Sequence, residues 1–304
     1  MNTIIRIESI AQVHDIIGYK SPKHPLITLI EPEKMKQLKI PIMNYQVISS
    51  LYAVSLKNGQ ECQILYGRQH YDFQEGTLMF MAPEQTVMPI KKSDVSEKAE
   101  WNGWVLLFHP DLIRKSSLVN KMNGYTFFNY DSHEALHISE KERYTVTDIV
   151  KTIEHEYSQN MDDFSKELIV SNIELLLNYC KRFYGRQFIT RSNVNKDLVM
   201  KFEAFITAYF ESDKLESNGL LSVKQCAKEM GYSANYLSDL LKRETGKNTQ
   251  EHIHYSIIEK GRNLLVSTNE PINQIAYALG FDYPQHFSKL FKTKTGMSPA
   301  EYRN

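Results

Sequence analysis

The spacing of apolar residues divides this chain of 304 residues into a β-rich part followed by helical parts. Between Tyr45 and about Phe108, short runs of strand-forming residues are separated by turn residues such as Asn58-Gly59, Gly67 and Pro83. Runs of this kind are typical of a β-sandwich or a small barrel. From Ser139 onward the apolar period changes to 3.6, which indicates helices. We therefore expect a two-domain α+β protein whose C-terminal domain is all α.

Two amphipathic helices are expected between residues 139 and 187, each with one apolar face. The second should end at Gly185, because basic residues precede this glycine and glycine commonly follows the last helical turn. The polar segment 190–196 is expected to be an interdomain linker. Near the N-terminus, SIAQVHDIIG predicts a short helix, and Pro22, Pro25 and Pro32 predict irregular structure after it. The two apolar faces consist of Val146, Ile149, Ile153 and Tyr157, and of Ile169, Ile173, Leu176, Leu177 and Cys180.

The stretch from Leu221 to Arg303 contains one sequence pattern twice. LSVKQCAKEMGYSANYLSDLLKRETGKNTQEHI aligns with PINQIAYALGFDYPQHFSKLFKTKTGMSPAEYR with one inserted residue. An internal repeat of about fifty residues indicates a duplicated supersecondary unit. Matched positions include Ala227 with Ala276, Gly231 with Gly280, Leu237 with Phe287, and Thr245-Gly246 with Thr295-Gly296.

Each copy has the parts of a helix-turn-helix motif. In the first copy a short helix carries Val223, Ala227 and Met230 on one face, Gly231 supplies a left-handed turn, and Ser233 caps the next helix. The second helices are expected at about 233–245 and 282–295. Four residue pairs have the spacing of a capping box, and Pro271 and Pro299 suit a first helical turn. The four pairs are Ser222 with Gln225, Asn248 with Glu251, Asp282 with Gln285, and Ser298 with Glu301.

A longer helix is expected between the two copies, from about Thr249 to Leu265. Its apolar side consists of Ile253, Ile257, Leu264 and Leu265. At 1.5 Å per residue this helix is about 25 Å long, which could hold two recognition helices near one DNA turn, about 34 Å, apart. We interpret it as a rigid spacer.

Composition adds few constraints. The chain has 36 basic and 36 acidic residues, and the part from Leu221 onward has 11 against 8, so DNA binding must depend on individually placed contacts. Cys62, Cys180 and Cys226 lack metal-ligand spacing, which fits a reducing cytosol. No apolar run reaches membrane length, and the N-terminus lacks the apolar core of a signal peptide.

The double helix-turn-helix that ends in GFDYPQHFSKLFKTKTGMSPAEYR resembles the DNA-binding domain of AraC/XylS-type transcription regulators, over about residues 197–304. The resemblance implies that both recognition helices enter the major groove of double-stranded DNA. Ile257, Gly261 and Asp239 depart from the family pattern, in which arginine, alanine and a basic residue are usual. A glycine inside a helix costs about 1 kcal/mol relative to alanine, so the spacer is expected to be either softer or closely packed at Gly261.

The resemblance also implies which residues contact DNA. Asn235 and Gln285 have the amide chemistry for adenine, Lys289 can reach guanine, and Asp239 can accept from cytosine. The implied base contacts are Ala234, Asn235, Ser238 and Asp239 in the first helix, and Pro284, Gln285, Ser288 and Lys289 in the second. The implied phosphate contacts are Lys242, Arg243, Lys292 and Lys294, for which the alternative is an ordinary solvated helix face.

The N-terminal part resembles the cupin-like sensing domain of such regulators, in YGRQHYDFQEGTLMFMAPEQ and WNGWVLLFHPDLI. This resemblance implies an N-terminal cupin-like β-barrel with flanking helices and a pocket for a small-molecule effector. We expect an effector-binding and dimerisation domain at 1–189, a linker at 190–196, and a DNA-binding domain at 197–304. The helices at about 139–187 either dimerise the chain or pack on the β domain. Trp101, Trp104, Phe80 and Tyr71 either line a pocket or form the core, so no effector contact is assigned.

No catalytic residue, metal site or cofactor is expected. His70, His109, His133 and His137 are scattered, and His109, which precedes Pro110, suits a turn. His252 and His254 would point to different sides of a helix. The leading hypothesis is a cytoplasmic, nucleoid-associated bacterial transcription regulator that responds to an effector, forms a homodimer, and has RNA polymerase as a further candidate partner. The alternatives are a DNA-binding regulator without an effector and a cupin-type enzyme with a regulatory tail.

Overall fold

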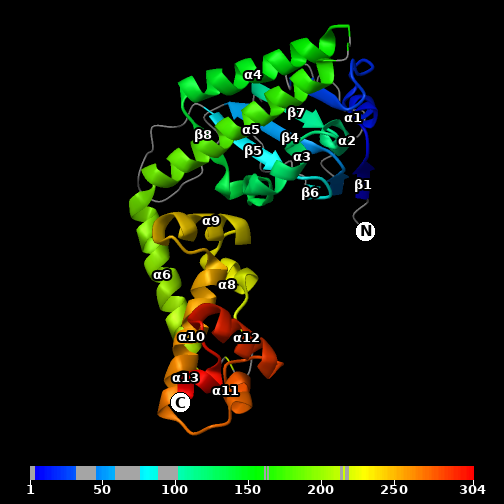
Figure 1. The fold of residues 1–304 in the computed structure, drawn as a ribbon. Helices are drawn as coiled ribbons and strands as arrows, with labels where there is room; N and C mark the ends of the chain where they lie inside the picture. The colour runs from blue at the N-terminus through cyan, green and yellow to red at the C-terminus, as the bar shows by residue number, and fades with distance from the viewer. Residues whose placement is uncertain are drawn as a thin grey trace. The chain divides into compact units, whose positions relative to one another are not determined.

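A computed structural model describes residues 4–31, 46–58, 76–87, 102–160, 162, 164–212, 215 and 219–304. The chain divides into two compact units, residues 1–187 and 188–304 (Figure 1). In the described parts of the chain, strands occur in the first unit and the second is helical. The predicted two-part α+β organisation is therefore seen, while the predicted domain limits of 1–189, 190–196 and 197–304 stay a prediction.

The described strands of the N-terminal unit form two sheets. The larger is antiparallel with the order β2-β7-β4-β5-β8, and in the smaller β3 pairs in parallel with β1 and antiparallel with β6. These are open sheets, so the predicted β-rich domain is confirmed but the closed barrel is not. The first sheet consists of β2 (Ile27–Ile30), β7 (Asn102–Phe108), β4 (Tyr52–Asn58), β5 (Gly76–Met81) and β8 (Leu136–Ile138), and the second of β1 (Ile4–Ile7), β3 (Gln46–Ser49) and β6 (Thr86–Val87).

Tyrosine side chains bind backbone groups at β2, the outer strand of the larger sheet among the described strands. The backbone N–H of Leu29 donates to the Tyr157 hydroxyl at 3.0 Å, and the Tyr19 hydroxyl donates to the Glu31 carbonyl at 2.9 Å. A buried backbone group without a partner is costly, so these two tyrosines stabilise β2 and the residue that follows it. Burial raises the pKa of Tyr157 to about 12, which keeps its hydroxyl protonated.

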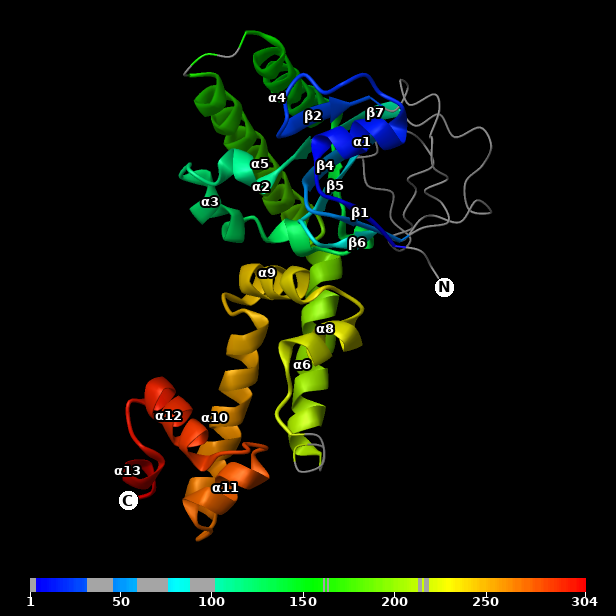
Figure 2. The ribbon, with the colours of Figure 1, turned by 90° about the vertical axis from the view of Figure 1, so that its right-hand side faces the viewer.

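Helices cover both faces of the larger sheet (Figures 1 and 2). Successive strand residues point to opposite faces, and on one face Val105 and Leu107 pack with Ile10, Val13 and Ile17 of α1 (Ile10–Ile17). On the other face Trp104 donates from Nε1 to Thr147 of α4 (Glu140–Ser158) at 3.2 Å. The short helix predicted in SIAQVHDIIG is confirmed, with Ser9 as its N-cap and Gly18 at φ 71° after it.

The two amphipathic helices are α4 and α5 (Ser165–Thr190). All nine residues of their predicted apolar faces are buried. The predicted end at Gly185 is wrong, because α5 continues to Thr190. Beyond the glycine, Gln187 is buried and exchanges hydrogen bonds with the backbone of Ala135 and His137, which offsets the weak helix propensity of Gly185.

An aromatic cluster fills the core beneath α5. The Phe80 and Phe127 ring centroids lie 4.5 Å apart, and those of Phe127 and Tyr184 lie 5.4 Å apart. Phe80 is therefore a core residue, whereas Trp101, Tyr71, His70, Cys62 and the turn at Asn58-Gly59 lie wholly or partly outside the described residues. Short helices connect β7 to β8: α2 (Pro110–Ile113), α3 (Leu118–Lys121), η4 (Met122–Gly124), η5 (Thr126–Asn129) and η6 (Ser132–Glu134).

The C-terminal unit is a bundle of helices. Residues 192–196, predicted to be a linker, belong to α6, and Arg191 alone separates this helix from α5. None of the helices in the described ranges is long and apolar enough to cross a membrane. The helices are α6 (Ser192–Glu211), α8 (Val223–Met230), α9 (Ala234–Thr245), α10 (Thr249–Ser267), α11 (Ile272–Ala278), α12 (Pro284–Thr295) and α13 (Pro299–Arg303).

Candidate nucleic-acid interface

The sequence repeat corresponds to two helix-turn-helix motifs, α8–α9 and α11–α12. Their turns contain Gly231 at φ 77° and Gly280 at φ 83°, both in the left-handed region that glycine adopts without strain. The residues predicted to pack the helix pairs are buried, including Ala227 and Ala276 on the first helices and Leu237 and Phe287 on the second. Both predicted motifs are therefore present.

The two recognition helices, α9 and α12, also end in the same way. The Thr245 hydroxyl donates to the Leu241 carbonyl at 2.8 Å, and the Thr295 hydroxyl donates to the Phe291 carbonyl at the same distance. Gly246 and Gly296 then follow at φ 78° and 83°. The repeated Thr-Gly pairs thus encode the same helix stop twice.

Three of the four predicted capping boxes form. Ser222 with Gln225, Asn248 with Glu251, and Ser298 with Glu301 each satisfy both backbone amides. The pair Asp282 with Gln285 does not, because α12 begins at Pro284, which makes Tyr283 the N-cap residue. The proline fixes the start of the helix one residue later than predicted, and the Gln285 amide is left out of the cap. Pro299 lies in the first turn as predicted, whereas Pro271 is the N-cap residue of α11.

The predicted base contacts differ in how accessible their polar groups are. Gln285 and Lys289 of α12 are exposed, and in the described part of the chain the Gln285 side chain makes no hydrogen bond. Asn235 and Asp239 of α9 are half-buried, as are the small apolar side chains of Ala234 and Pro284.

The two predicted serine contacts are already used within the protein. Ser238 Oγ donates to Thr249 Oγ1 at 3.0 Å, which connects α9 to the start of α10. Ser288 Oγ donates to the Pro284 carbonyl at 3.2 Å. A hydroxyl has one proton to donate, so these serines could only accept hydrogen bonds from DNA without rearranging.

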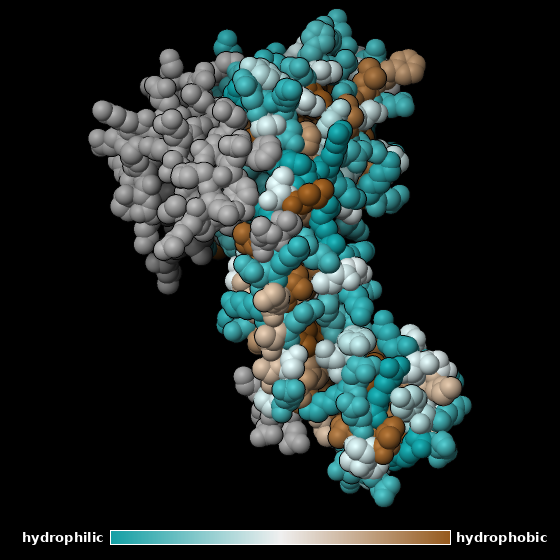
Figure 3. All heavy atoms as spheres, turned by 90° about the vertical axis from the view of Figure 1, so that its left-hand side faces the viewer, coloured by the Kyte–Doolittle hydropathy of each residue, from teal (hydrophilic) through white to brown (hydrophobic). Residues whose placement is uncertain are grey.

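The four predicted phosphate contacts, Lys242, Arg243, Lys292 and Lys294, are all exposed. They lie in the last turns of α9 and α12, where a cation also interacts favourably with the helix dipole. Hydrophilic side chains predominate on the face of this unit drawn in the lower part of Figure 3. The arrangement fits either of the two roles predicted for these cations.

The spacer helix α10 is closely packed at the position where the family pattern is broken. A Cβ at Gly261 would lie 3.0 Å from Cε2 of Phe287 and 3.4 Å from Cδ1 of Leu279. Ile257 is 2% exposed, so it is a core residue where an arginine is usual. Of the two expectations for Gly261, close packing is therefore the one seen, and α10 carries the recognition helix α12 through Phe287.

Two aromatic side chains beside the predicted contacts were not identified from the sequence. Tyr283 is 58% exposed at the start of α12, and its ring centroid lies 5.5 Å from that of the exposed His286. Tyr255 on α10 is 55% exposed, with Lys247 Nζ 4.2 Å from its ring centroid. Pro284 could have identified Tyr283 from the sequence. A proline suits the first residue of a helix, so the residue before it is expected to be the N-cap.

The histidines and cysteines discussed below, all in the described part of the chain, fit structural roles. His109 caps α2, accepting from the Asp111 backbone N–H at 3.1 Å, as expected of a turn residue. His252 lies 2.7 Å from Thr245 Oγ1 and His254 lies 2.8 Å from Gln250 Nε2, so they do point to different partners. Asp131, His133 and Glu134 bring possible ligand atoms within 4.8 Å, but Glu134 accepts from the Asp131 backbone N–H in a capping box. Burial raises the pKa of the Cys226 thiol to about 12 and also raises that of Cys180.

Comparison with known proteins agrees with this geometry. Residues 226–304 match a family model described as a helix-turn-helix domain. The uncharacterized HTH-type transcriptional regulator YobQ of Bacillus subtilis is 34% identical over 97 residues, which are 32% of this chain and 39% of that protein. The xylose operon regulatory protein of Escherichia coli is 34% identical over 84 residues, 28% of this chain and 21% of that protein. This chain thus spans less than half the length of either relative.

The chain is also similar to a solved structure. A transcriptional regulator of Chromobacterium violaceum, described as having an AraC-type DNA-binding domain, is 30% identical, with 29% of this chain and 81% of that chain covered and a TM-score of 0.27. The names of these three proteins describe regulators and not enzymes. The C-terminal unit of this chain is thus similar to the helix-turn-helix domains of transcription regulators, including those of the AraC/XylS type.

Proposed function

We propose that this chain is a transcription regulator that binds specific sequences of double-stranded DNA through two recognition helices. The observation that carries the proposal is the pair of helix-turn-helix motifs with matching turns and helix ends, one of which exposes an amide and an amine side by side on α12. Two recognition helices, α9 and α12, joined by the spacer helix α10 can enter two segments of the major groove on one side of the duplex.

Within this proposal Gln285 and Lys289 are the principal base readers. Both are exposed, and an amide and an amine match adenine and guanine edges in the major groove. Asn235 and Asp239 of α9 also contact base edges, although their side chains are half-buried. Ser238 and Ser288 contribute less, because their protons are committed inside the protein.

The test is selection of random duplex DNA by the full chain, followed by titration of the enriched site at two salt concentrations. We expect two short conserved blocks about one helical turn apart. Salt-sensitive binding without enrichment of any sequence would contradict the proposal.

A pair of variants on α12 separates base reading from phosphate contact. Gln285→Ala should cost about 1–3 kcal/mol on the selected site and relax the preference at one base pair. Lys292→Ala should weaken all sequences alike and reduce the salt slope by about one unit. If Gln285→Ala weakened every sequence equally, Gln285 would not be a base reader.

The N-terminal unit supports a sensing role in the same proposal. We propose that it is a cupin-like domain that binds a small effector, and that α4 and α5 join two copies of the chain. A solved relative named as a xylose-binding transcription activator is 30% identical, with 35% of this chain and 26% of that chain covered. Saturable binding of a small molecule that changes DNA affinity would establish the coupling that effector control requires.

The site of action follows from the proposed partner. A regulator that binds chromosomal DNA in a bacterium works in the cytoplasm, where RNA polymerase is a further candidate partner. Detection of the chain on its selected promoter in cells, by crosslinking and sequencing, tests this part of the proposal.

A further inference from the structure

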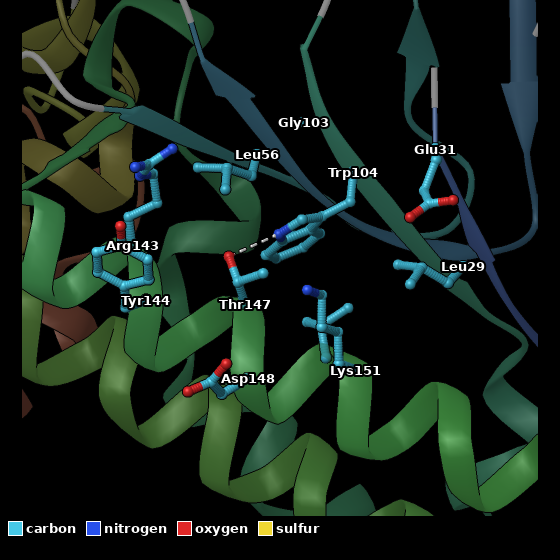
Figure 4. A pocket seen from close by; sticks show the side chains of 11 residues that line it. Leu29, Glu31, Leu56, Gly103, Trp104, Arg143, Tyr144, Thr147, Asp148 and Lys151 are labelled. Carbon is cyan, nitrogen blue, oxygen red and sulfur yellow. Dashed lines mark hydrogen bonds between the residues drawn. The ribbon is translucent and has the colours of Figure 1, made fainter. Parts of the chain in front are cut away.

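The N-terminal unit has a groove of about 390 Å³ between α4 and the larger sheet (Figure 4). It lies on the face of the sheet that carries Trp104, opposite the face on which α1 packs. Pockets for small molecules range from about 300 to 1,000 Å³, so the groove has room for a small ligand.

The floor of the groove is apolar and firmly held. Leu29, Leu56 and Trp104 form it, each less than 9% exposed. The indole is fixed by its hydrogen bond to Thr147. A Cβ on the adjacent Gly103 would lie 2.0 Å from the Leu56 carbonyl oxygen, so β4 and β7 approach too closely there for any side chain. The floor is therefore preformed.

The wall of the groove is one stripe of α4. Arg143, Thr147 and Lys151 recur every four residues and so share a helix face. Figure 4 shows Arg143 on one side of Thr147 and Lys151 on the other, with Glu31 beyond Trp104 and the Asp148 carboxylate turned away from the indole. Eight residues of helix separate the two cations by about 12 Å along the axis.

Arg143 is the polar group that most clearly requires a partner. Its Nε is buried and makes no hydrogen bond to any described residue, while its guanidinium carbon lies 5.3 Å from the Tyr144 ring centroid. Buried polar groups in proteins are nearly always paired. A guanidinium stays charged and matches a carboxylate with two parallel hydrogen bonds.

We propose that this groove binds a small monocarboxylate with an apolar body. The carboxylate accepts hydrogen bonds from Arg143, and the apolar body lies along Leu56, Trp104 and Leu29. Lys151 and Glu31 carry opposite charges at the other end, which favours a neutral group there over a second carboxylate. The proposal rests on the proposed regulator function only for its consequence on transcription, because binding is measured without DNA.

The test uses the full chain with octanoate and 4-phenylbutyrate as probes, and octanamide and 4-phenylbutyramide as neutral matches. Binding is measured by calorimetry, with tryptophan fluorescence to report on the floor of the groove. We expect at least one carboxylate to bind saturably and its amide to bind at least about tenfold more weakly, because the amide cannot form the charged pair.

Variants of α4 locate the binding site. Arg143→Gln should weaken the carboxylate at least about tenfold, and Arg143→Lys should weaken it less, because the charge remains and the paired geometry is lost. Lys141→Gln is the matched control, since Lys141 is an exposed cation of the same helix that does not line the groove. Thermal unfolding checks that each variant is folded. Equal affinity for acid and amide, no binding of either acid, or unchanged affinity in Arg143→Gln would overturn the proposal.

DNA selection on the same preparations separates this proposal from the proposed function. Carboxylate binding that depends on Arg143, without enrichment of a DNA site, would support the groove and refute the regulator. Enrichment of a DNA site with no carboxylate binding would support the regulator and refute the carboxylate groove.

Discussion

At the scale of single residues, three glycines of the C-terminal unit have different surroundings. A Cβ at Gly231 would meet nothing within 4 Å, whereas one at Gly280 would lie 3.0 Å from the Gly219 carbonyl carbon and the Leu220 nitrogen. Gly261 has an ordinary helical conformation but faces the buried Phe287 ring. Positions that look alike in the sequence repeat therefore tolerate substitution differently.

Gly231→Ala and Gly280→Ala form a matched pair. The left-handed backbone should cost about 1–2 kcal/mol for alanine at either position. Gly280→Ala should cost more, because backbone atoms cannot move aside as a flexible side chain does. Urea unfolding of both variants measures the difference. Equal losses of unfolding free energy would mean that the contact with Gly219 is easily relieved.

Gly261→Ala tests the contact between α10 and α12. Alanine should gain about 1 kcal/mol of helix propensity over glycine, but crowding in a packed core costs about 1–3 kcal/mol. We expect a net loss of stability, measured by urea unfolding. The added change Phe287→Leu should recover part of it by making room, and a stabilised single variant would show that the ring moves aside.

At the scale of elements, a half-buried polar contact holds the recognition helix α9 to its neighbours. His252 of α10 donates to Thr245 at the end of α9, because the one proton of Thr245 is directed to a backbone carbonyl. The Phe202 ring of α6 stands edge-on to the same imidazole, with the centroids 5.4 Å apart. Burial lowers the pKa of His252, with Lys247 acting in the same direction and Glu203 and Glu251 opposing.

This contact predicts a pH dependence of stability. The unfolded chain binds a proton at His252 near pH 6.5, whereas the folded chain binds it only at lower pH. The contribution of neutral His252 to the free energy of unfolding is therefore complete above about pH 6.5. It is lost as the pH falls towards the lowered pKa of the folded chain. Urea unfolding between pH 7.5 and 5.5 should show a shallower decline for His252→Gln than for the unchanged chain. Parallel curves would exclude His252 as a source of the decline.

At the scale of the whole molecule, α5 has apolar side chains that its own unit does not bury. Phe164, just before the helix, is 68% exposed, and Leu168 and Leu175 are 46% and 44% exposed. Leu168 and Leu175 are seven residues apart and share one helix face. Such a stripe supports the proposal that two copies of the chain associate through this helix.

Leu168→Glu with Leu175→Glu should convert a dimer to a monomer, because two carboxylates would be placed in an apolar interface. Sedimentation equilibrium of the full chain measures the mass. Val266→Glu is the control, as Val266 is 73% exposed on a different helix. A monomeric unchanged chain would rule out this association, and a dimeric double variant would place it elsewhere.

The sequence by itself determined the local structure of the C-terminal unit. Glycine turns, capping boxes and apolar periodicity act within one or two helical turns, so both helix-turn-helix motifs were predictable, together with most of their boundaries. The N-cap of α12 lies one residue later than predicted, at Tyr283 instead of Asp282, because two local signals competed and Pro284 fixed the start of the helix. In the N-terminal unit, the buried faces of α4 and α5 and several strands were equally predictable.

The tertiary structure decided features that depend on residues far apart in the chain. Tyr157 and Tyr19 form hydrogen bonds with backbone groups of Leu29 and Glu31. A hydrogen bond from Gln187 to the Ala135 carbonyl stabilises α5 beyond Gly185. Phe287 fills the space beside Gly261. The groove that contains Trp104 and Arg143 likewise forms only when α4 packs on the sheet. These contacts join residues 12 to 128 positions apart along the chain. They have no local period or motif, so only the folded structure brings them together.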